Sequence, residues 1–219
     1  MNRFAIALLA GVAGVSVMSS AFAADLIISE PAPAVGVVST TGNWDGLFLG
    51  AFAGYGWGTV TDEDGYFAAA GTETDVKGWQ VGVSAGANFT VSEAIVAGIV
   101  GDIAWTDLNG DVDADSSYSV DWTGSLRGRL GFDGGAFLPY VTAGVAFANT
   151  TVTDAALEDT QTHIGWTVGA GVEFAVADNV SLDLQYRYTD FGSKTYDLGG
   201  PTDFSLTSHA VTAGVNFRF

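Results

Sequence analysis

Histidines are the residues of this sequence best suited to acid–base catalysis near neutral pH, and there are two, His163 and His209. Neither belongs to a zinc-binding pattern such as His-Glu-x-x-His, and they fall near the ends of different predicted strands. The chain also has no cysteine, which excludes thiolate metal sites and cysteine nucleophiles. The sequence therefore predicts a protein that is not an enzyme, with no catalytic residues, no cofactor and no metal site.

Charged residues are the second group that could do chemistry, because they recur at alternate positions. In residues 118–132, Asp121, Arg127 and Arg129 share a parity opposite to that of the large apolar side chains. Opposite charges enclosed in a narrow space need partners, since an unpaired buried charge is costly. The sequence predicts a ladder of salt bridges or, alternatively, a gated ion path. The residues predicted to form this ladder or to line this path are Asp102, Asp121, Arg127, Arg129, Glu173, Asp183, Arg187 and Arg218.

The elements that must position these charges are segments in which apolar and polar residues alternate, the pattern of a half-buried β-strand. Each segment has about ten residues or more, enough to cross a bilayer as a tilted strand. No stretch after residue 44 reaches the roughly 18 uninterrupted apolar residues of a transmembrane helix. The eight segments lie near Gly46–Gly58, Lys77–Thr90, Ala94–Thr106, Tyr118–Phe132, Phe137–Thr151, Thr162–Val176, Val180–Thr189 and Phe204–Phe219.

Composition indicates that the apolar faces of these segments meet lipid. Hydrophobic residues make up 48% of the chain and charged residues only 15%, and there are 30 glycines. A soluble sandwich or barrel would also alternate, but its polar face would be rich in Lys and Glu. Here that face carries Gly, Ser, Thr and a few opposite charges, which suit a narrow barrel interior. The predicted fold is all-β, an eight-stranded antiparallel transmembrane β-barrel with up-and-down topology.

The N-terminal residues have the pattern of a secretory signal, with a basic Met1–Arg3, an apolar stretch and a cleavage site at Ala21–Ala23. Residues 24–43 are rich in Pro, Ala, Val, Ser and Thr and lack a sustained period, which indicates an extended linker. We therefore expect a signal peptide at 1–23, a periplasmic linker at 24–43 and the barrel at 44–219.

The connections between segments alternate between long and short. In outer-membrane barrels the long loops face outside and the short turns face the periplasm. The predicted long loops hold 15 of the 25 acidic residues and lie at 58–76, 107–117, 153–161 and 190–203.

Solvated acidic loops are the simplest reading of these segments, and loose binding of divalent cations that bridge to lipopolysaccharide phosphates is the alternative. The run Asp107–Asp113 hints at a calcium loop. An EF-hand is excluded because its turn glycine falls at the fourth place and Tyr118 stands at the twelfth. The net charge of −18 argues against nucleic-acid binding.

Tryptophans cluster towards the long-loop ends of the predicted strands, where an interfacial aromatic girdle is expected, although ordinary core tryptophans are the alternative. The predicted girdle consists of Trp57, Trp79, Trp105, Trp122 and Trp166.

Several motifs between residues 44 and 219 resemble the family of small outer-membrane immunogenic proteins, which is itself similar to the OmpA transmembrane barrel and the opacity porins. The motifs are Trp44–Gly50, Gly124–Gly131 with Pro139-Tyr140, Gly165–Glu173, Tyr186-Arg187-Tyr188 and Asn216–Phe219. The resemblance implies a location in the outer membrane of a Gram-negative cell. It also implies that the terminal Phe219 is read by the barrel assembly machinery.

The expected function is that of a surface antigen-like barrel that stabilises the envelope and presents acidic loops, with outer-membrane lipid and lipopolysaccharide as partners. A narrow porin-like channel is the alternative. Some members of the resembling family are described as haem-binding, and two histidines could ligate haem iron if their strands were neighbours. We expect surface or girdle histidines instead, because haem also needs a cavity. The sequence leaves the oligomeric state open.

Overall fold

The computed structural model describes residues 44–65, 69–111, 116–154, 157–197 and 201–219. The predicted signal peptide and linker lie outside the described residues. Among the described residues there is no helix long and apolar enough to span a membrane. The strands are β1 (Gly46–Asp62), β2 (Thr72–Ser92), β3 (Ile95–Asp111), β4 (Ser116–Phe132), β5 (Phe137–Asp154), β6 (Leu157–Ala177), β7 (Val180–Asp197) and β8 (Pro201–Arg218).

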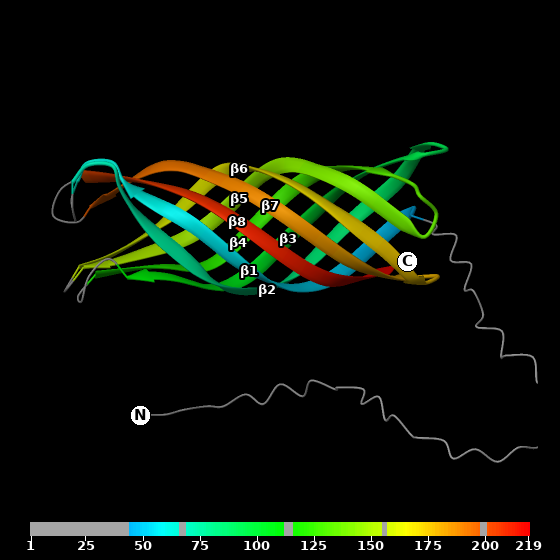
Figure 1. The fold of residues 1–219 in the computed structure, drawn as a ribbon, viewed down its shortest axis with the longest axis horizontal. Helices are drawn as coiled ribbons and strands as arrows, with labels where there is room; N and C mark the ends of the chain where they lie inside the picture. Colours follow the sequence, from blue (N-terminus) through cyan, green and yellow to red (C-terminus); the bar gives the residue numbers. More distant parts are fainter. Residues whose placement is uncertain (1–43, 66–68, 112–115, 155–156, 198–200) are drawn as a thin grey trace, which may run out of the picture. The chain divides into compact units, whose positions relative to one another are not determined.

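The strands form one closed barrel in which each strand pairs antiparallel with its neighbours in the sequence (Figure 1). Closure comes from the pairing of β1 with β8, for example Phe48 with Arg218 and Asp62 with Phe204. The predicted fold class, an eight-stranded antiparallel barrel, is therefore confirmed. Figure 1 places the start of β1 and the C-terminus at one end of the barrel, here called the termini end. The opposite end, where β1–β2, β3–β4, β5–β6 and β7–β8 turn back, is called the hairpin end.

At the hairpin end, the strands extend further than the sequence pattern indicated. They contain 17 to 21 residues, whereas about 9–11 residues of a tilted strand cross a bilayer. The predicted long loops are wrong in extent, because strand covers most of them and leaves only 63–71, 112–115, 155–156 and 198–200 between strands. Polar residues such as Thr and Asp occupy these extensions, so no apolar face marked them as strand.

Side chains alternate between the outer face and the lumen along each strand. Large apolar residues such as Leu126 and Leu130 on β4 are exposed on the outer face, while Arg127 and Arg129 between them are buried. An apolar exterior around a polar interior is the reverse of a soluble barrel and matches one that sits in lipid.

Small residues make room inside the barrel for aromatic side chains. A Cβ added at Gly86 would collide with the ring of Phe48, which is 3% exposed, and one at Gly82 would collide with Phe52. Glycine at these wall positions leaves room for two phenylalanine rings inside the barrel.

Irregular pairing near the hairpin end changes which side chains face inward. The β4–β5 register shifts between Val120 and Trp122, so two residues of β4 face one of β5. Asp121, predicted to face the lumen, is therefore exposed on the outside and accepts a hydrogen bond from Thr151. Val120, which shares the parity of the large apolar side chains in this segment, is buried instead.

Two apolar clusters occupy the lumen at different heights. The hairpin-end cluster joins side chains of seven strands and consists of Val60, Val76, Leu108, Val120, Ala146, Ala148, Phe191, Phe204 and Leu206. The termini-end cluster consists of Trp44, Val96 and Leu138, with Ala175 packed against them. The charged part of the lumen lies between these clusters.

Candidate functional site

The first charged group in the lumen is centred on Asp102 of β3. Its carboxylate accepts Nη2 of Arg127 at 2.8 Å and Nη1 of Arg187 at 2.9 Å, one guanidinium on each oxygen. Ser125 also donates its hydroxyl to Asp102 and accepts Nε of Arg127 at 2.8 Å. These contacts connect β7 to β3 and β4 across the interior of the barrel. In the sheet itself, β7 pairs with neither of these strands.

The second charged group is centred on Glu173 of β6, whose side chain is 1% exposed. Its Oε2 accepts Nη2 of Arg129 at 2.5 Å and its Oε1 accepts Nη2 of Arg218 at 2.9 Å. Ser181 donates to the same Oε1 at 2.5 Å. The guanidinium of Arg218 lies 4.8 Å from the centre of the Trp44 ring, so this group rests directly on the termini-end cluster.

A third carboxylate, that of Asp183, is bonded differently. It accepts the hydroxyl of Tyr140 at 2.7 Å, and Nε2 of Gln185 donates to that hydroxyl oxygen at 3.1 Å. The guanidinium of Arg129 lies over the Tyr140 ring, 3.7 Å from its centre. Gln185 also accepts Nη1 of Arg127 at 2.9 Å, which links the groups of Asp102 and Asp183.

The structure therefore brings seven of the eight predicted lumen charges together and leaves Asp121 outside. The predicted set of charges did not include Tyr140 and Gln185, which connect the charged groups. The parity of β5 could have indicated Tyr140, because Thr142, two residues on, also faces the lumen. We call the connected set the Arg–carboxylate network; its members are Asp102, Arg127, Arg129, Glu173, Asp183, Arg187 and Arg218.

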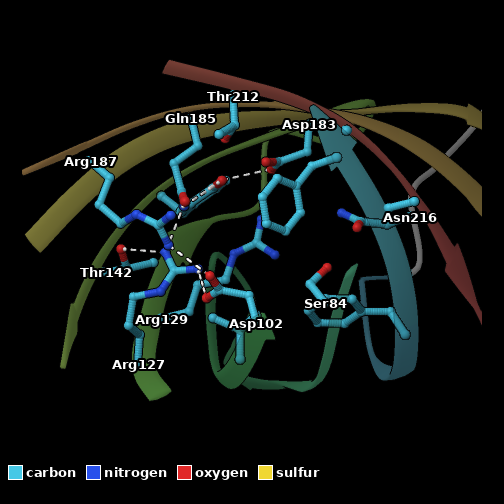
Figure 2. A pocket seen from close by; sticks show the side chains of 16 residues that line it. Ser84, Asp102, Arg127, Arg129, Thr142, Asp183, Gln185, Arg187, Thr212 and Asn216 are labelled. Carbon is cyan, nitrogen blue, oxygen red and sulfur yellow. Dashed lines mark hydrogen bonds and ion pairs between the residues drawn. The ribbon is translucent and has the colours of Figure 1, made fainter. Parts of the chain in front are cut away.

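Two small cavities border the network, each of about 40 Å³. The central cavity is shown in Figure 2 and is lined by Phe48, Asp183, three arginines of the network and several polar side chains. The other lies between Asp102 and the hairpin-end cluster, where Leu108 and Phe191 line it. A water molecule needs roughly 10–15 Å³ of cavity volume, so each cavity holds a few water-sized groups and no larger solute.

All five tryptophans of the predicted girdle lie on the outer face, with exposed fractions from 36% for Trp122 to 68% for Trp79. Trp57 stacks on His209 at 5.7 Å between ring centres with an interplanar angle of 12°. Nδ1 of His209 lies 2.7 Å from the Tyr186 hydroxyl, so His209 belongs to an aromatic patch on the outer surface.

The position predicted for His163 is wrong. Its side chain is 2% exposed inside the barrel, where it meets the edge of Phe191 at 6.5 Å between ring centres. His209 faces outward on β8, so the two histidines lie on opposite sides of the barrel wall, and one haem could not bind both.

The sequence contains one motif that is typical of a nucleophilic serine. Residues Gly82–Gly86 read Gly-Val-Ser-Ala-Gly. In hydrolases this pattern forms a sharp turn between a strand and a helix, which exposes the serine. Here Ser84 lies within the continuous strand β2 and faces the lumen. The geometry is therefore not that of a nucleophile elbow. Among the described residues, no three His, Asp or Glu side chains come together as ligands for a metal ion.

A closed antiparallel barrel of eight strands, apolar outside and charged inside, is the architecture of a bacterial outer-membrane protein. Solved structures share this fold. Neisserial surface protein A aligns with a TM-score of 0.52 and 20% identity over 79% of this chain and 97% of that chain. OprG from Pseudomonas aeruginosa aligns with a TM-score of 0.52 and 16% identity over 82% and 98%.

Residues 7–219 match the model of the outer membrane protein beta-barrel domain, and the chain belongs to that family. The 25 kDa outer-membrane immunogenic protein of Brucella abortus is 33% identical over 205 residues, which cover 92% of each protein. The 22 kDa outer membrane protein of Rhizobium leguminosarum is 33% identical over 186 residues, covering 83% of this chain and 81% of that protein. The protein is thus an outer-membrane β-barrel, and its predicted family and location are confirmed.

Proposed function

We propose that this protein is a closed outer-membrane barrel with a structural and surface-interaction role rather than an enzyme. The observation that carries the proposal is the presence of side chains at three heights inside the barrel. From one end to the other, side chains of the termini-end cluster, the Arg–carboxylate network and the hairpin-end cluster follow one another. A solute could cross only if all three layers moved aside.

The energetics of the network favour a closed state. Each ion pair lies in a desolvated interior, where removing one partner of a charge pair typically costs about 3–5 kcal/mol. Opening a path past Glu173 would separate it from two guanidiniums at once. The network therefore suits a lumen that holds the wall together.

The hairpin end is the part of the barrel suited to contacts outside the cell. With both ends of the barrel domain in the periplasm, the strand extensions project outward. They carry exposed acidic side chains such as Glu73, Asp75 and Asp107. The names of the Brucella relatives describe immunogenic proteins, which supports surface exposure.

The proposed partners are outer-membrane lipid, lipopolysaccharide and the barrel assembly machinery. The apolar outer face with its tryptophans meets the lipid. Phe219, 71% exposed, packs edge-on against Phe217 at 5.0 Å and extends the apolar outer face of β8. That position leaves the terminal ring accessible to an assembly factor.

Orientation can be tested directly because the chain contains no cysteine. We expect Glu73→Cys, at the hairpin end, to react with a bulky membrane-impermeant maleimide in intact cells. Asp178→Cys, which also replaces an exposed acid, in the turn between β6 and β7, should react only after the outer membrane is permeabilised. Labelling of Asp178→Cys in intact cells would reject the proposed orientation.

A narrow channel for ions or small solutes is the second candidate. It is favoured by the two cavities, which lie on both sides of Asp102 and Arg187 and would form part of any path. Swelling of proteoliposomes in isosmotic glycine separates the two functions. A closed barrel gives the rate of protein-free liposomes, and faster swelling supports the channel.

A further inference from the structure

The wall of the barrel is incomplete between β6 and β7 at the hairpin end. The ladder that joins these two strands stops at the pair of Trp166 with Asp190. Beyond that pair, β6 continues through its pairing with β5 as far as Leu157, and β7 continues through its pairing with β8 as far as Asp197. In Figure 1 the tips of β5 and β6 lie at the lower left and those of β7 and β8 at the upper left. Within the described part of the chain, β6 and β7 therefore each have one edge without a neighbouring strand beyond this pair.

The local sequence of β7 explains why the two strands separate. The pairing of β7 with β8 shifts register between Asp190 and Ser193. Gly192 lies in the left-handed region at φ 63°, and its N–H donates to Oδ1 of Asp190 at 2.8 Å. Phe191 turns into the lumen, where it is 6% exposed in the hairpin-end cluster. A bulge of this kind bends its strand, so β7 leaves β6 directly above Trp166.

The edge that β6 presents is regular. Its pairing with β5 continues to Leu157 without a register shift. The backbone N–H of Ala175 donates to Ala136, on the β5 side. Because this direction alternates along a strand, Thr162 and Ile164 point their N–H and C=O groups to the opposite side, towards β7. The β7 edge is less suited to pairing, because the bulge interrupts it.

The same edge lacks the usual protection against further pairing. Edge strands commonly carry charged residues, especially lysine, or proline. The segment Gln161–Gly165 contains no proline, no lysine and no acidic residue. Trp166, just below it, belongs to the aromatic girdle, so the edge lies outside the hydrocarbon core. An unpaired edge would be costly in lipid, whereas here water solvates it and a polypeptide could replace that water.

We infer that the β6 edge beyond Trp166 binds an extended segment of another protein, which adds to the sheet as a strand antiparallel to β6. Its main chain hydrogen-bonds to Thr162 and Ile164, as in other cases of strand addition. Ile164 is 66% exposed and Trp166 is 49% exposed on the outer face, so the segment places an apolar side chain beside them. The net charge of −18 favours basic residues at its other positions. The inference deepens the proposed surface-interaction role and rests on the orientation proposed for it.

The first test uses the purified protein folded in micelles of a zwitterionic detergent. The probe is a short fluorescent peptide in which valine and lysine alternate. Its control is the same peptide with every backbone nitrogen methylated, which keeps the sequence and the charge but removes the backbone donors. We expect saturable binding of the first peptide by fluorescence anisotropy. The methylated peptide should bind about tenfold more weakly or less, because several backbone hydrogen bonds are lost. Equal affinities would indicate charge attraction alone and overturn the inference.

Two variants at one position place the binding on the β6 edge. Ile164→Pro removes an N–H that faces away from β5, so it should abolish binding while the β5–β6 ladder stays intact. Ile164→Val keeps that N–H and should bind the peptide as the wild type does. The gel shift on heating confirms that both variants are folded barrels. Unchanged binding to Ile164→Pro would contradict strand addition at this edge.

Amide hydrogen exchange of the wild-type protein, followed by NMR, locates the site without variants. The peptide should slow exchange at Thr162 and Ile164 and leave Ser193 and Thr195 on the β7 edge unchanged. Slower exchange only on β7, or at none of these amides, would reject the β6 edge. Protection of Thr162 and Ile164 in a peptide-free protein that sediments as a dimer would identify a second copy as the occupant and reject the partner segment.

These measurements fail separately from the proposed function. They use the protein in detergent, so their outcome does not depend on its orientation in the cell. Absence of peptide binding would leave the orientation and the closed lumen untouched. Labelling of Asp178→Cys in intact cells would reject the orientation whether or not the peptide binds.

Discussion

Arg129 of β4 and Glu173 of β6 meet across the lumen, with Nη2 and Oε2 2.5 Å apart, although β4 and β6 do not pair with each other. Backbone hydrogen bonds join only neighbouring strands of the barrel. This contact instead joins strands two places apart, and Asp102 does the same for β3 with β7 at a greater separation. The network is therefore an internal brace that the ladder of the sheet cannot supply.

Removal of the carboxylate from this brace should destabilise the barrel strongly. Glu173→Ala leaves the guanidiniums of Arg129 and Arg218 without their shared buried partner, so we expect a loss of about 3–5 kcal/mol in the free energy of unfolding. Urea unfolding in lipid vesicles measures it. Asp121→Ala is the matched control, because that exposed side chain should change the value by less than about 0.5 kcal/mol. Similar losses in the two variants would contradict a bracing role.

The glycine at position 86 should be required for packing inside the barrel. Gly86→Ala puts a methyl group into the space of the Phe48 ring, and overpacking of this kind typically costs about 1–3 kcal/mol. Gly128→Ala, whose Cβ would meet only a carbonyl oxygen of Ala143 at 3.8 Å, should leave stability unchanged or slightly raised. The prediction fails if both variants unfold at the same urea concentration.

The tryptophans should differ in their access to lipid. Trp44 is 1% exposed and donates Nε1 to the carbonyl of Gly135 at 3.2 Å, whereas Trp79 is 68% exposed on the outer face. In variants that keep a single tryptophan and replace the others by phenylalanine, brominated lipid should quench the fluorescence of Trp79 and leave that of Trp44 nearly unchanged. Strong quenching of Trp44 would place it outside the lumen.

The terminal aromatic residue should affect assembly more than stability. Phe219→Ala removes a ring that is 71% exposed, so the unfolding free energy should stay near that of the wild type. If the assembly machinery reads this ring, the amount of folded protein in the outer membrane of growing cells should fall. Phe89→Ala, an exposed phenylalanine of β2, is the control and should assemble normally. Normal assembly of both variants would remove Phe219 from this role.

The eight strands could be predicted because contact with lipid requires apolar residues on the outer face of each strand. Large apolar residues recur at alternate positions of the membrane-spanning part, as Leu126, Leu130 and Phe132 illustrate on β4. Beyond the membrane, neither face of a strand meets lipid. The extensions towards Asp62 and Asp111 therefore resembled acidic loops in the sequence.

Parts of the lumen could not be predicted because a bulge reverses the parity that assigns side chains to a face. The register shift next to Asp121 moves that residue outward and turns Val120 inward, and nothing in the local sequence marks it. The partners of each charge depend on the relative heights of strands that are distant in the sequence. The presence of opposite charges was therefore predictable, whereas the sharing of Glu173 by two arginines was not.

The most direct test of the closed lumen is single-channel recording of the purified wild-type barrel in planar lipid bilayers. Insertion is verified independently by the gel shift on heating of protein recovered from the same proteoliposomes. The proposed closed lumen predicts a baseline current at every applied voltage. Reproducible conductance steps of uniform size would contradict the closed barrel and establish a channel.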